Sequence, residues 1–406
     1  MSSRRVVVTG IGVINPAGLG LDRFWERVST GTSALRRIRR FDPEQFPAQV
    51  AGELVDFRPA DYIHRRWVVK TDTFIHFACA ASKLALEDAR LDLAQEDPYR
   101  IGVFFGNNSG GWDISERGWY EFHQQSPLET NPWQATAWFP TGAQGFVTII
   151  FGLKGYSKSF VCDRASGAYG LYFGARSIRL SHTDITLAGG TEAPISRLGL
   201  TCYIGTGDLA LAREPDGAYR PFDARRSGLV LGEGSTVLIL EELEHARLRG
   251  AQIYGEILGG ATASDRAPAA HQGLVRTMRR ALEQSSTSPG SIDLILAEGS
   301  GSPLGDQVEA RAITEVFGER AAEIPVTVPK ATYGHLYGAS GASELACGLL
   351  AMKTGIVPPT LGYSEPDPAC PLYIVTRPER RAVSTVLLNA RSREGVNVSL
   401  VVGAVR

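Results

Sequence analysis

The sequence predicts a layered α/β fold in which mixed β-sheets lie between helices. Three observations lead to this fold class. Short runs of β-branched residues alternate with amphipathic helical patterns along most of the chain. Glycine-rich turns follow several of the apolar runs, as they do where strands end at one edge of an α/β sheet. No low-complexity or linker-like stretch divides the chain, so the layers are expected to pack in one body.

The expected strands are short and mostly buried. They are residues 5–9, 100–105, 185–188, 235–241, 294–297, 326–328 and 396–402. Amphipathic helices are expected at residues 73–89 and 274–283. The β/α alternation starts again after a softer joint at residues 244–251. We therefore expect two closely packed halves, residues 1–250 and 251–406.

Composition narrows the class of protein. The 406 residues are 43% apolar and 21% charged with a formal net charge of -1, which suits two large lobes and argues against a dedicated nucleic-acid binder. The apolar run at residues 6–8 is too short for a signal peptide or a membrane span. The five cysteines are scattered without a CxxC motif or a metal-binding spacing. We therefore expect reduced thiols in a cytoplasmic protein, with no bound metal or cofactor.

The first glycine-rich turn, residues 9–18, is similar to a dinucleotide fingerprint in its first two glycines. The third glycine of that fingerprint is absent, and Pro16 would interrupt the helix that must follow. A tight strand-to-helix turn is therefore expected here in preference to a nucleotide site.

The second turn, residues 161–168, follows a strand-like run and precedes a helical pattern at residues 165–179. A strand, a sharp turn and a helix N-terminus form the geometry that presents a nucleophile, because free backbone amides and the helix dipole stabilise a thiolate. Here the turn presents Arg164. Cys162 lies two residues earlier, where a strand would point it away from the helix dipole.

Three more glycine-rich turns adjoin apolar strands, at residues 297–306, 329–341 and 388–397. Five such turns behind strands predict one site assembled at strand ends.

Together these segments resemble the β-ketoacyl synthases of fatty-acid and polyketide synthesis, which have the thiolase fold. The most specific matches are the Gly-His-x-x-Gly-Ala-x-Gly run at residues 334–341 and the Arg-Pro-Phe-Asp run at residues 220–223. The resemblance covers nearly the whole chain. It implies two pseudo-duplicated layered halves with mixed five-stranded sheets between helices. It also implies a cysteine nucleophile and two histidines that assist decarboxylation.

The sequence departs from this family at the positions that carry the chemistry. By resemblance, Arg164 stands where the family has its cysteine, Glu298 where it has its first histidine, and Arg393 where it has a gating phenylalanine. The second histidine and its accompanying lysine are present as His335 and Lys330. The chain is therefore expected to have no catalytic residue set of its own.

One branch of the family, the chain length factors of type II polyketide synthases, also lacks the cysteine. Its elbow, close to Asp-Gln-Ala-Gly-Gly, resembles residues 163–167, and its Ala-Trp-Phe run resembles residues 137–139. The resemblance implies a non-catalytic subunit that forms a heterodimer with an active ketosynthase. Such a subunit shapes the acyl tunnel while the complex elongates a polyketide from malonyl units on an acyl carrier protein.

Arg164 and Glu298 carry opposite charges at positions that approach each other in a working ketosynthase. We expect them to pair, with Asp163 as the second choice of partner, because an unpaired cation at a buried helix N-terminus is unfavourable. The alternative is that the Arg164 side chain reaches solvent. His335 and Lys330 are expected to keep a structural hydrogen-bond network. Arg393 is expected to line or block the former substrate entrance.

An aromatic-rich and irregular segment, about residues 115–138, occupies the middle of the chain. By resemblance it lies at the dimer interface and lines the acyl tunnel. The candidate residues are Trp112, Ser115, Glu116, Trp119, Trp133, Ala137, Trp138, Phe139 and Thr141. The alternative is that its aromatic side chains form ordinary core.

Two other functions stay open from the sequence. The chain could be an independent enzyme, either a decarboxylase using Lys330 and His335 or an acyltransferase using Cys162. It could also be a pseudoenzyme that only stabilises its partner.

Overall fold

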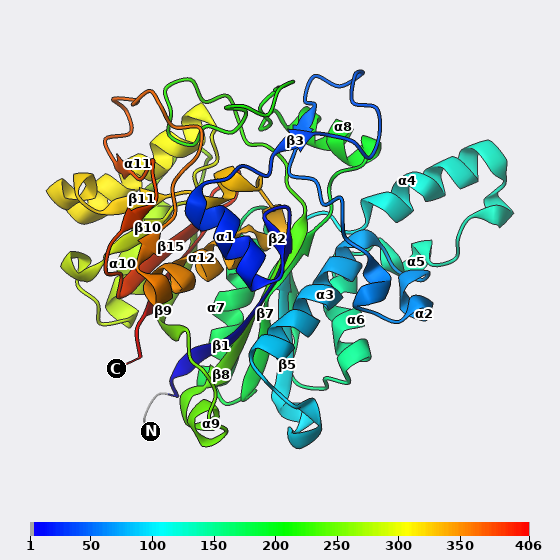
Figure 1. Ribbon diagram of the computed structural model, residues 1–406, viewed down its shortest axis with the longest axis horizontal. Helices are drawn as coiled ribbons and strands as arrows, with labels where there is room; N and C mark the ends of the chain where they lie inside the picture. The colour runs from blue at the N-terminus through cyan, green and yellow to red at the C-terminus, as the bar shows by residue number, and fades with distance from the viewer. Residues whose placement is uncertain (1–3, 406) are drawn as a thin grey trace.

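A single twisted β-sheet runs through the computed structural model, which describes residues 4–405 (Figure 1). Within those residues the sheet has 12 strands, and its order is β13-β11-β10-β15-β16-β9-β1-β8-β7-β5-β6, with β2 paired to β1. The N-terminal strands are β1 (Val6–Asn15), β2 (Gly18–Leu19), β5 (Ile101–Gly106), β6 (Lys158–Phe160), β7 (Ile185–Glu192) and β8 (Gly234–Glu242). The C-terminal strands are β9 (Gly255–Ser264), β10 (Leu294–Leu296), β11 (Pro325–Thr327), β13 (Tyr373–Ile374), β15 (Thr385–Arg391) and β16 (Val396–Gly403).

The strand order of the N-terminal half repeats in the C-terminal half. In β6-β5-β7-β8-β1 the first two neighbouring pairs are parallel and the last two are antiparallel. The order β11-β10-β15-β16-β9 has the same pattern. Each half therefore supplies a mixed five-stranded sheet, as expected. The two sheets are also continuous, because β1 pairs with β9 through Val7 and Val8.

Helices form three layers around this sheet (Figure 1). Helices α7 (Ser166–Arg179) and α12 (Ser340–Thr354) pack on each other in the middle layer, inside the largest apolar core. Helix α3 (Thr73–Asp88) covers the other face of the N-terminal strands, and α10 (Gln272–Gln284) covers that of the C-terminal strands. The remaining helices are α1 (Leu21–Thr30), α2 (Arg65–Val68), α4 (Trp112–Tyr120), α5 (Gln134–Ala137), α6 (Gly142–Phe151), α8 (Arg197–Thr206), α9 (Leu243–Leu248) and α11 (Pro303–Phe317).

The two middle helices begin with the same sequence. Ala-Ser-Gly-Ala occurs at residues 165–168 and again at 339–342. Ser166 Oγ accepts a hydrogen bond from the backbone N–H four residues earlier at 2.8 Å, and Ser340 Oγ does the same at 3.0 Å. The residue three positions before each serine has a positive φ; these residues are Asp163 (φ 52) and Tyr337 (φ 43). The turn is thus repeated residue by residue, and position 164 of the first turn corresponds to position 338 of the second.

Small residues let these helices approach closely. A Cβ added at Gly341 would lie 2.9 Å from Ala168 Cβ, and one at Gly167 would lie 2.5 Å from the carbonyl oxygen of Gly338. Close backbone contact of this kind requires glycine. The small residues of both helix starts therefore follow from packing in the middle layer.

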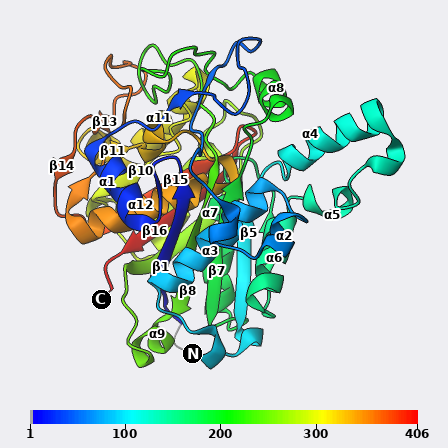
Figure 2. The same cartoon turned by 45° about the vertical axis from the view of Figure 1, so that its right-hand side comes forward.

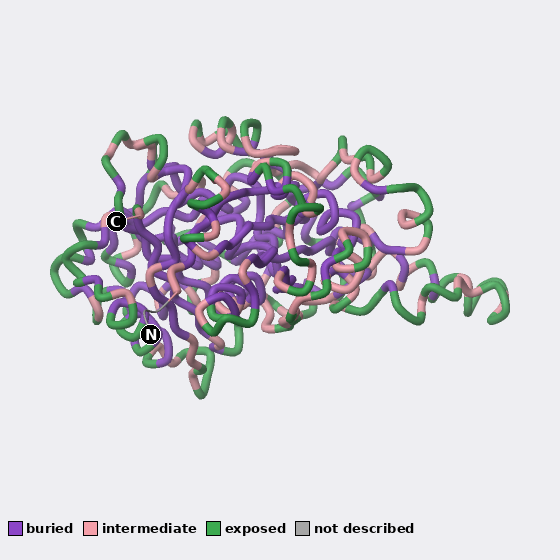
Figure 3. The backbone as a smooth tube through the Cα atoms, turned by 90° about the horizontal axis from the view of Figure 1, so that it is seen from below, coloured by how far each residue is buried: buried purple, intermediate pink, exposed green. Residues whose placement is uncertain are grey.

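An arm formed by residues 112–138 projects from the body (Figures 2 and 3). It consists of α4, a π-helical turn at Glu121–Gln125, a 3-10 turn at Pro127–Glu129, and α5. The expected irregularity is therefore confined to the tip. At the base, the Asp72 carboxylate accepts hydrogen bonds from the backbone N–H of Ile114 at 2.6 Å and of Phe74 at 3.4 Å, so one side chain joins α4 to α3.

Two short hairpin-like pairs lie outside the main sheet, β3 (Arg36–Arg37) with β4 (Val50–Ala51), and β12 (Ile356–Val357) with β14 (Glu379–Arg380). A search of residues 4–405 for helices of sufficient length and hydropathy to cross a membrane finds none.

Candidate functional site

Four of the five glycine-rich turns meet at the N-termini of α7 and α12. Glu298 belongs to the turn at residues 297–306, and its carboxylate contacts Arg164, His335 and the backbone N–H of Arg391, each in one of the other three turns. Asp163 makes a further link between two of these turns, because its carboxylate accepts from the backbone N–H of Arg393. The first turn, residues 9–18, whose residues 15–18 link β1 to β2, is not part of this site. No hydrogen bond or ion pair links it to the others within residues 4–405, so the expectation of five turns at one site is wrong for that turn. It is also a β-hairpin between β1 and β2, not the expected strand-to-helix turn.

Glu298 lies at the centre of the site. Its Oε1 is 2.8 Å from His335 Nε2, its Oε2 is 3.4 Å from Lys330 Nζ, and its carbonyl oxygen accepts a 2.6 Å hydrogen bond from Lys330 Nζ. Burial by itself would raise the pKa of Glu298. Lys330, His335 and Arg164 outweigh burial and lower this pKa to about 2. Glu298 is therefore a carboxylate with its oxygens already engaged.

The hydrogen bonds of His335 fix its tautomer. Its Nδ1 accepts from the backbone N–H of Tyr337 at 3.0 Å, so the ring proton must be on Nε2. That nitrogen donates to Glu298 Oε1. Burial, followed by the charge of Lys330, lowers the pKa of His335 to about 4. His335 is thus a neutral imidazole whose only proton is used inside the protein.

Lys330 is completely buried between two carboxylates. Its Nζ is 2.5 Å from Glu344 Oε1 in addition to its contacts with Glu298. Burial lowers the pKa of Lys330, and the two nearby glutamates Glu298 and Glu309 oppose that shift. The expected structural network of Lys330 and His335 is present, with Glu298 as its shared acceptor.

Arg164 points into the protein and is only 5% exposed, so the alternative that it reaches solvent is wrong. Its Nε lies 3.4 Å from Asp163 Oδ2 and 4.0 Å from Glu298 Oε1. The second-choice partner is therefore the nearer one. Neither Nε nor Nη1 makes a hydrogen bond. Burial would lower the pKa of Arg164, but the charges of Asp163 and Glu298 prevail and raise it. A buried cation thus sits at the start of α7 with electrostatic support but incomplete hydrogen bonding.

Arg393 contacts this group through its backbone. Its N–H donates to Asp163 Oδ2 at 2.9 Å, while its side chain, 45% exposed, lies 3.6 Å from Asp208 Oδ2. Asp163 consequently links the Arg164 turn to the Arg393 turn.

Cys162 is half-buried beside the site, and its surroundings disfavour a thiolate. Burial, together with the negative charge of Asp163, raises the pKa of the Cys162 thiol. A catalytic thiol requires the opposite shift.

Two buried glutamates of the site escaped the sequence analysis. Glu309 accepts hydrogen bonds from the backbone N–H of Glu298 and of Gly299, both at 2.9 Å, and so holds the turn that carries Glu298. Glu344 supports Lys330 from α12. Glu344 could have been recognised in the sequence as a buried, paired carboxylate, because it is the single charged residue in a run of small and apolar helical residues at 342–346.

The aromatic residues of the arm divide into two groups. Trp112 lies at the base, where its Nε1 donates to Ser109 Oγ at 2.6 Å and its ring packs near Tyr203. Trp119, Phe122, Trp133 and Trp138 of the arm are exposed, as is the adjoining Phe139, and Trp119 is 63% exposed. The alternative of ordinary core is wrong for these five. Although Trp112 and Trp119 share a helix face, α4 leaves the body between them.

The other arm candidates lie around this surface. The Glu116 carboxylate accepts from the backbone N–H of Leu198 at 2.9 Å, and Ser115 Oγ donates to the Gly111 carbonyl oxygen at 2.6 Å. Ala137 is buried and Thr141 is exposed. Ser115, Trp119 and Trp138 line a largely apolar cavity of about 590 Å³.

The described residues contain no cluster of three or more His, Cys, Asp or Glu side chains that could hold a metal ion.

Comparison with known proteins agrees with this fold and these turns. The family model for the N-terminal domain of β-ketoacyl synthases matches residues 3–246, and the model for the C-terminal domain matches residues 248–364. The chain belongs to the β-ketoacyl synthase family.

Its relatives include a ketoacyl synthase beta subunit and a 3-oxoacyl-[acyl-carrier-protein] synthase. It is 36% identical over 401 residues, 98% of each chain, to the ketoacyl synthase beta subunit of the tetracenomycin polyketide synthase of Streptomyces glaucescens. It is 34% identical, over the full length of both chains, to the 3-oxoacyl-[acyl-carrier-protein] synthase 2 of Coxiella burnetii.

Two solved structures cover the whole chain. The ishigamide ketosynthase/chain length factor superposes with a TM-score of 0.93 at 31% identity. A type II polyketide ketosynthase, solved with its acyl-carrier protein and bound to a hexaketide, superposes with a TM-score of 0.91 at 28% identity.

Proposed function

We propose that this chain is a chain-length-factor subunit of a type II polyketide synthase. In this proposal it pairs with an active ketosynthase in the cytoplasm and helps to shape the acyl tunnel while malonyl units are added on an acyl carrier protein. The observation that carries the proposal is the buried Arg164 at the N-terminus of α7, with Glu298 set between it, His335 and Lys330. A guanidinium cannot form the acyl thioester on which condensation depends.

The state of His335 supports the same function. A histidine that assists decarboxylation by hydrogen bonding or proton donation needs a ring N–H that can reach the substrate. Here that proton is donated to Glu298, and Lys330 is enclosed by Glu298 and Glu344. An independent decarboxylase is therefore poorly supported. The raised pKa of the Cys162 thiol likewise argues against an acyltransferase.

The edge of the sheet beside the site offers a surface for a partner. In the described residues β6 is an end strand that pairs only with β5. Ile149, Tyr156 and Val161 are exposed on or near it. Natural proteins rarely leave an open strand edge beside exposed apolar side chains, because such an edge pairs with another chain. All five cysteines are free, which suits the reducing cytoplasm.

The test is co-expression with an active ketosynthase of a type II polyketide synthase. We expect a one-to-one complex that elongates malonyl-carrier protein, whereas this chain alone consumes none. The matched control is the same complex with the nucleophilic cysteine of the ketosynthase replaced by alanine, which should form but not condense. Consumption of malonyl-carrier protein by this chain alone would contradict the proposal in favour of an independent enzyme.

Exposed aromatic residues of the arm separate a chain length factor from a merely stabilising pseudoenzyme. Trp119→Ala and Trp138→Ala should change the length of the polyketide made by the complex, because both line the apolar cavity of the arm. Tyr99→Ala is the control, since Tyr99 is equally exposed but lies before β5, away from the arm. Unchanged product length in both tryptophan variants would leave the stabilising role.

A further inference from the structure

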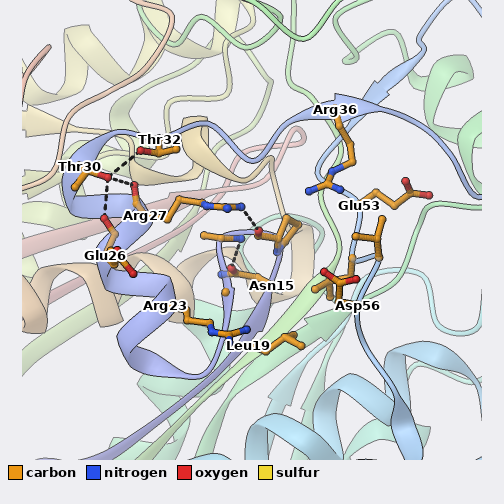
Figure 4. A pocket seen from close by; sticks show the side chains of 15 residues that line it. Asn15, Leu19, Arg23, Glu26, Arg27, Thr30, Thr32, Arg36, Glu53 and Asp56 are labelled. Carbon is orange, nitrogen blue, oxygen red and sulfur yellow. Dashed lines mark hydrogen bonds between the residues drawn. The ribbon is translucent and has the colours of Figure 1, made fainter.

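A second cavity lies beside the first glycine-rich turn, apart from the site described above (Figure 4). It has a volume of about 640 Å³ and is enclosed by residues 15–19, helix α1 and residues 53–56. Three arginines, Arg23, Arg27 and Arg36, line it. Figure 4 shows the Arg27 and Arg36 side chains reaching towards each other from opposite walls.

In the part of the chain that the structure describes, these three arginines have no carboxylate partner. Most buried or half-buried arginines of the chain form ion pairs, for example Arg226 with Asp367 and Arg391 with Asp265. Within residues 4–405, Arg23, Arg27 and Arg36 form none, and Arg27 Nη1 donates only to the carbonyl oxygen of Pro16. Facing guanidinium groups repel each other unless an anion lies between them.

The nearest buried carboxylate is not available to them. Both oxygens of Glu53 accept backbone N–H groups, from Arg39 at 3.0 Å and from Arg40 at 2.8 Å. In Figure 4 this carboxylate points away from the cavity. Glu26 and Asp56 also line the cavity, and both are exposed and form no ion pair in the described residues.

Two buried donors at the cavity wall lack acceptors. Asn15 is 1% exposed, and its Oδ1 accepts from the backbone N–H of Ala17, while its Nδ2 has no partner. Arg36 Nε is also buried without a partner. Buried donors are nearly always satisfied, and both vacancies here call for an oxygen acceptor.

We propose that this cavity binds the phosphate group of a small, hydroxylated phosphate monoester. Arg27 and Arg36 hold the phosphate from two sides, since the guanidinium fork matches phosphate oxygens, and Arg23 adds charge at the rim. The volume exceeds that of a phosphate ion, and the Glu26 and Asp56 carboxylates can accept hydrogen bonds from hydroxyl groups of the ester. A nucleotide-binding turn holds phosphate with the backbone N–H groups of a helix N-terminus. The turn here is a β-hairpin, so arginine side chains hold the phosphate instead. This inference does not depend on the proposed function.

The test is isothermal titration of the purified complex, or of the chain itself, with inorganic phosphate, glycerol 3-phosphate and glycerol. We expect saturable binding of both phosphates, tighter for glycerol 3-phosphate, and none of glycerol. Arg27→Gln and Arg36→Gln should each weaken binding by about tenfold, which is the loss of one charge-assisted hydrogen bond. Arg23→Gln, at an exposed position, should weaken it by a smaller factor.

Arg276→Gln is the matched control, because Arg276 is exposed on α10, far along the chain from the cavity, and forms no ion pair in the described residues. It should bind both phosphates as the unaltered protein does. The proposal is overturned if neither phosphate binds saturably, or if Arg276→Gln weakens binding as much as Arg27→Gln. Thermal unfolding of each variant separates lost binding from lost folding.

Discussion

The turn before α7 and the turn before α12 share a sequence, a serine hydrogen bond and a positive-φ residue, but they differ at one position. Residue 164 is an arginine that points toward Glu298, whereas residue 338 is a glycine pressed against Asn107 and Glu192. The shared features hold the middle layer together, because both helices need the same start to pack closely. Close packing requires glycine at position 338, whereas position 164 accommodates a long side chain. Function can therefore change at 164 while the fold stays.

The largest effect is expected from Glu298, the acceptor that both turns contact. Glu298→Gln leaves Lys330 with one carboxylate and Arg164 with only Asp163, so the free energy of unfolding should fall by about 3–5 kcal/mol. Urea denaturation measures it. Glu283→Gln, at an exposed position of α10, is the control and should change stability little. A loss as small as that of the control would show that Glu298 does not join the two turns.

The same variant gives a pH dependence. The pKa of Glu298 is lowered from 4.5 to about 2 in the folded protein, so its stabilisation is fully present above pH 4.5 and is lost as the pH falls toward 2. The difference in stability between the unaltered protein and Glu298→Gln should shrink over that window. A difference that stays constant would mean that the charge of Glu298 contributes nothing.

The next effect tests whether position 338 is constrained by packing. An added Cβ at Gly338 would lie 2.7 Å from Asn107 Cα and 2.9 Å from Glu192 Oε2. Gly338→Ala should therefore lower the free energy of unfolding by about 1–3 kcal/mol. Chemical denaturation would reveal it. A neutral Gly338→Ala would break the contrast between the two turns, because position 338 would then be as free as position 164.

The repeated serines should contribute similarly. Ser166→Ala and Ser340→Ala each remove the acceptor for a backbone N–H, that of Cys162 or of Leu336, and should each cost about 1–2 kcal/mol. Thermal unfolding of both variants side by side provides the comparison. Losses that agree within about 0.5 kcal/mol would sharpen the structural repeat. A loss at Ser340 alone would show that the α7 turn is held by other contacts.

The smallest effect is expected at Arg164. Two of its nitrogens are buried without hydrogen bonds, so Arg164→Met replaces an incompletely satisfied cation by an apolar side chain of similar length. Glu298 keeps Lys330 and His335 as partners, and Asp163 keeps the backbone N–H of Arg393. The substitution therefore leaves neither carboxylate without a partner, and we expect a change within about 1 kcal/mol. Calorimetry of the variant would show it. Strong destabilisation would mean that Arg164, like Gly338, is a requirement of the fold.

The sequence was sufficient for the strands with β-branched residues and for the amphipathic helices, such as α3 and α10. It was not sufficient for β9, whose run Gly-Glu-Ile-Leu-Gly-Gly-Ala-Thr-Ala-Ser has low β-propensity. An added Cβ at Gly259 would lie 2.6 Å from the backbone nitrogen of Ser285, so the strand carries glycine because α10 lies directly on it. Tertiary packing thus overrode the local pattern. Strand β15 was missed because its end was assigned to a glycine-rich turn.

The site was partly predictable for a related reason. The resemblance placed Arg164, Glu298, His335 and Lys330 near one another, and the structure brings them together. The preference of Arg164 for Asp163 could not be predicted, because it depends on the positive φ of Asp163, which turns that carboxylate back toward Arg164 and Arg393. Backbone conformation at a single non-glycine residue leaves no clear mark in a sequence.

The position of β16 has a consequence for synthesis of the chain. The five strands of the N-terminal half are all available once residue 242 has emerged from the ribosome, so that half can fold early. In the C-terminal half, β9 can pair early with β1 at one edge, but its other edge must wait for residues 396–403, because β16 lies between β9 and β15. A nascent chain therefore carries β9 with its β16 edge unpaired for some 130 residues of translation, from the end of β9 to the start of β16. Chaperones that shield strand edges should matter most during that interval.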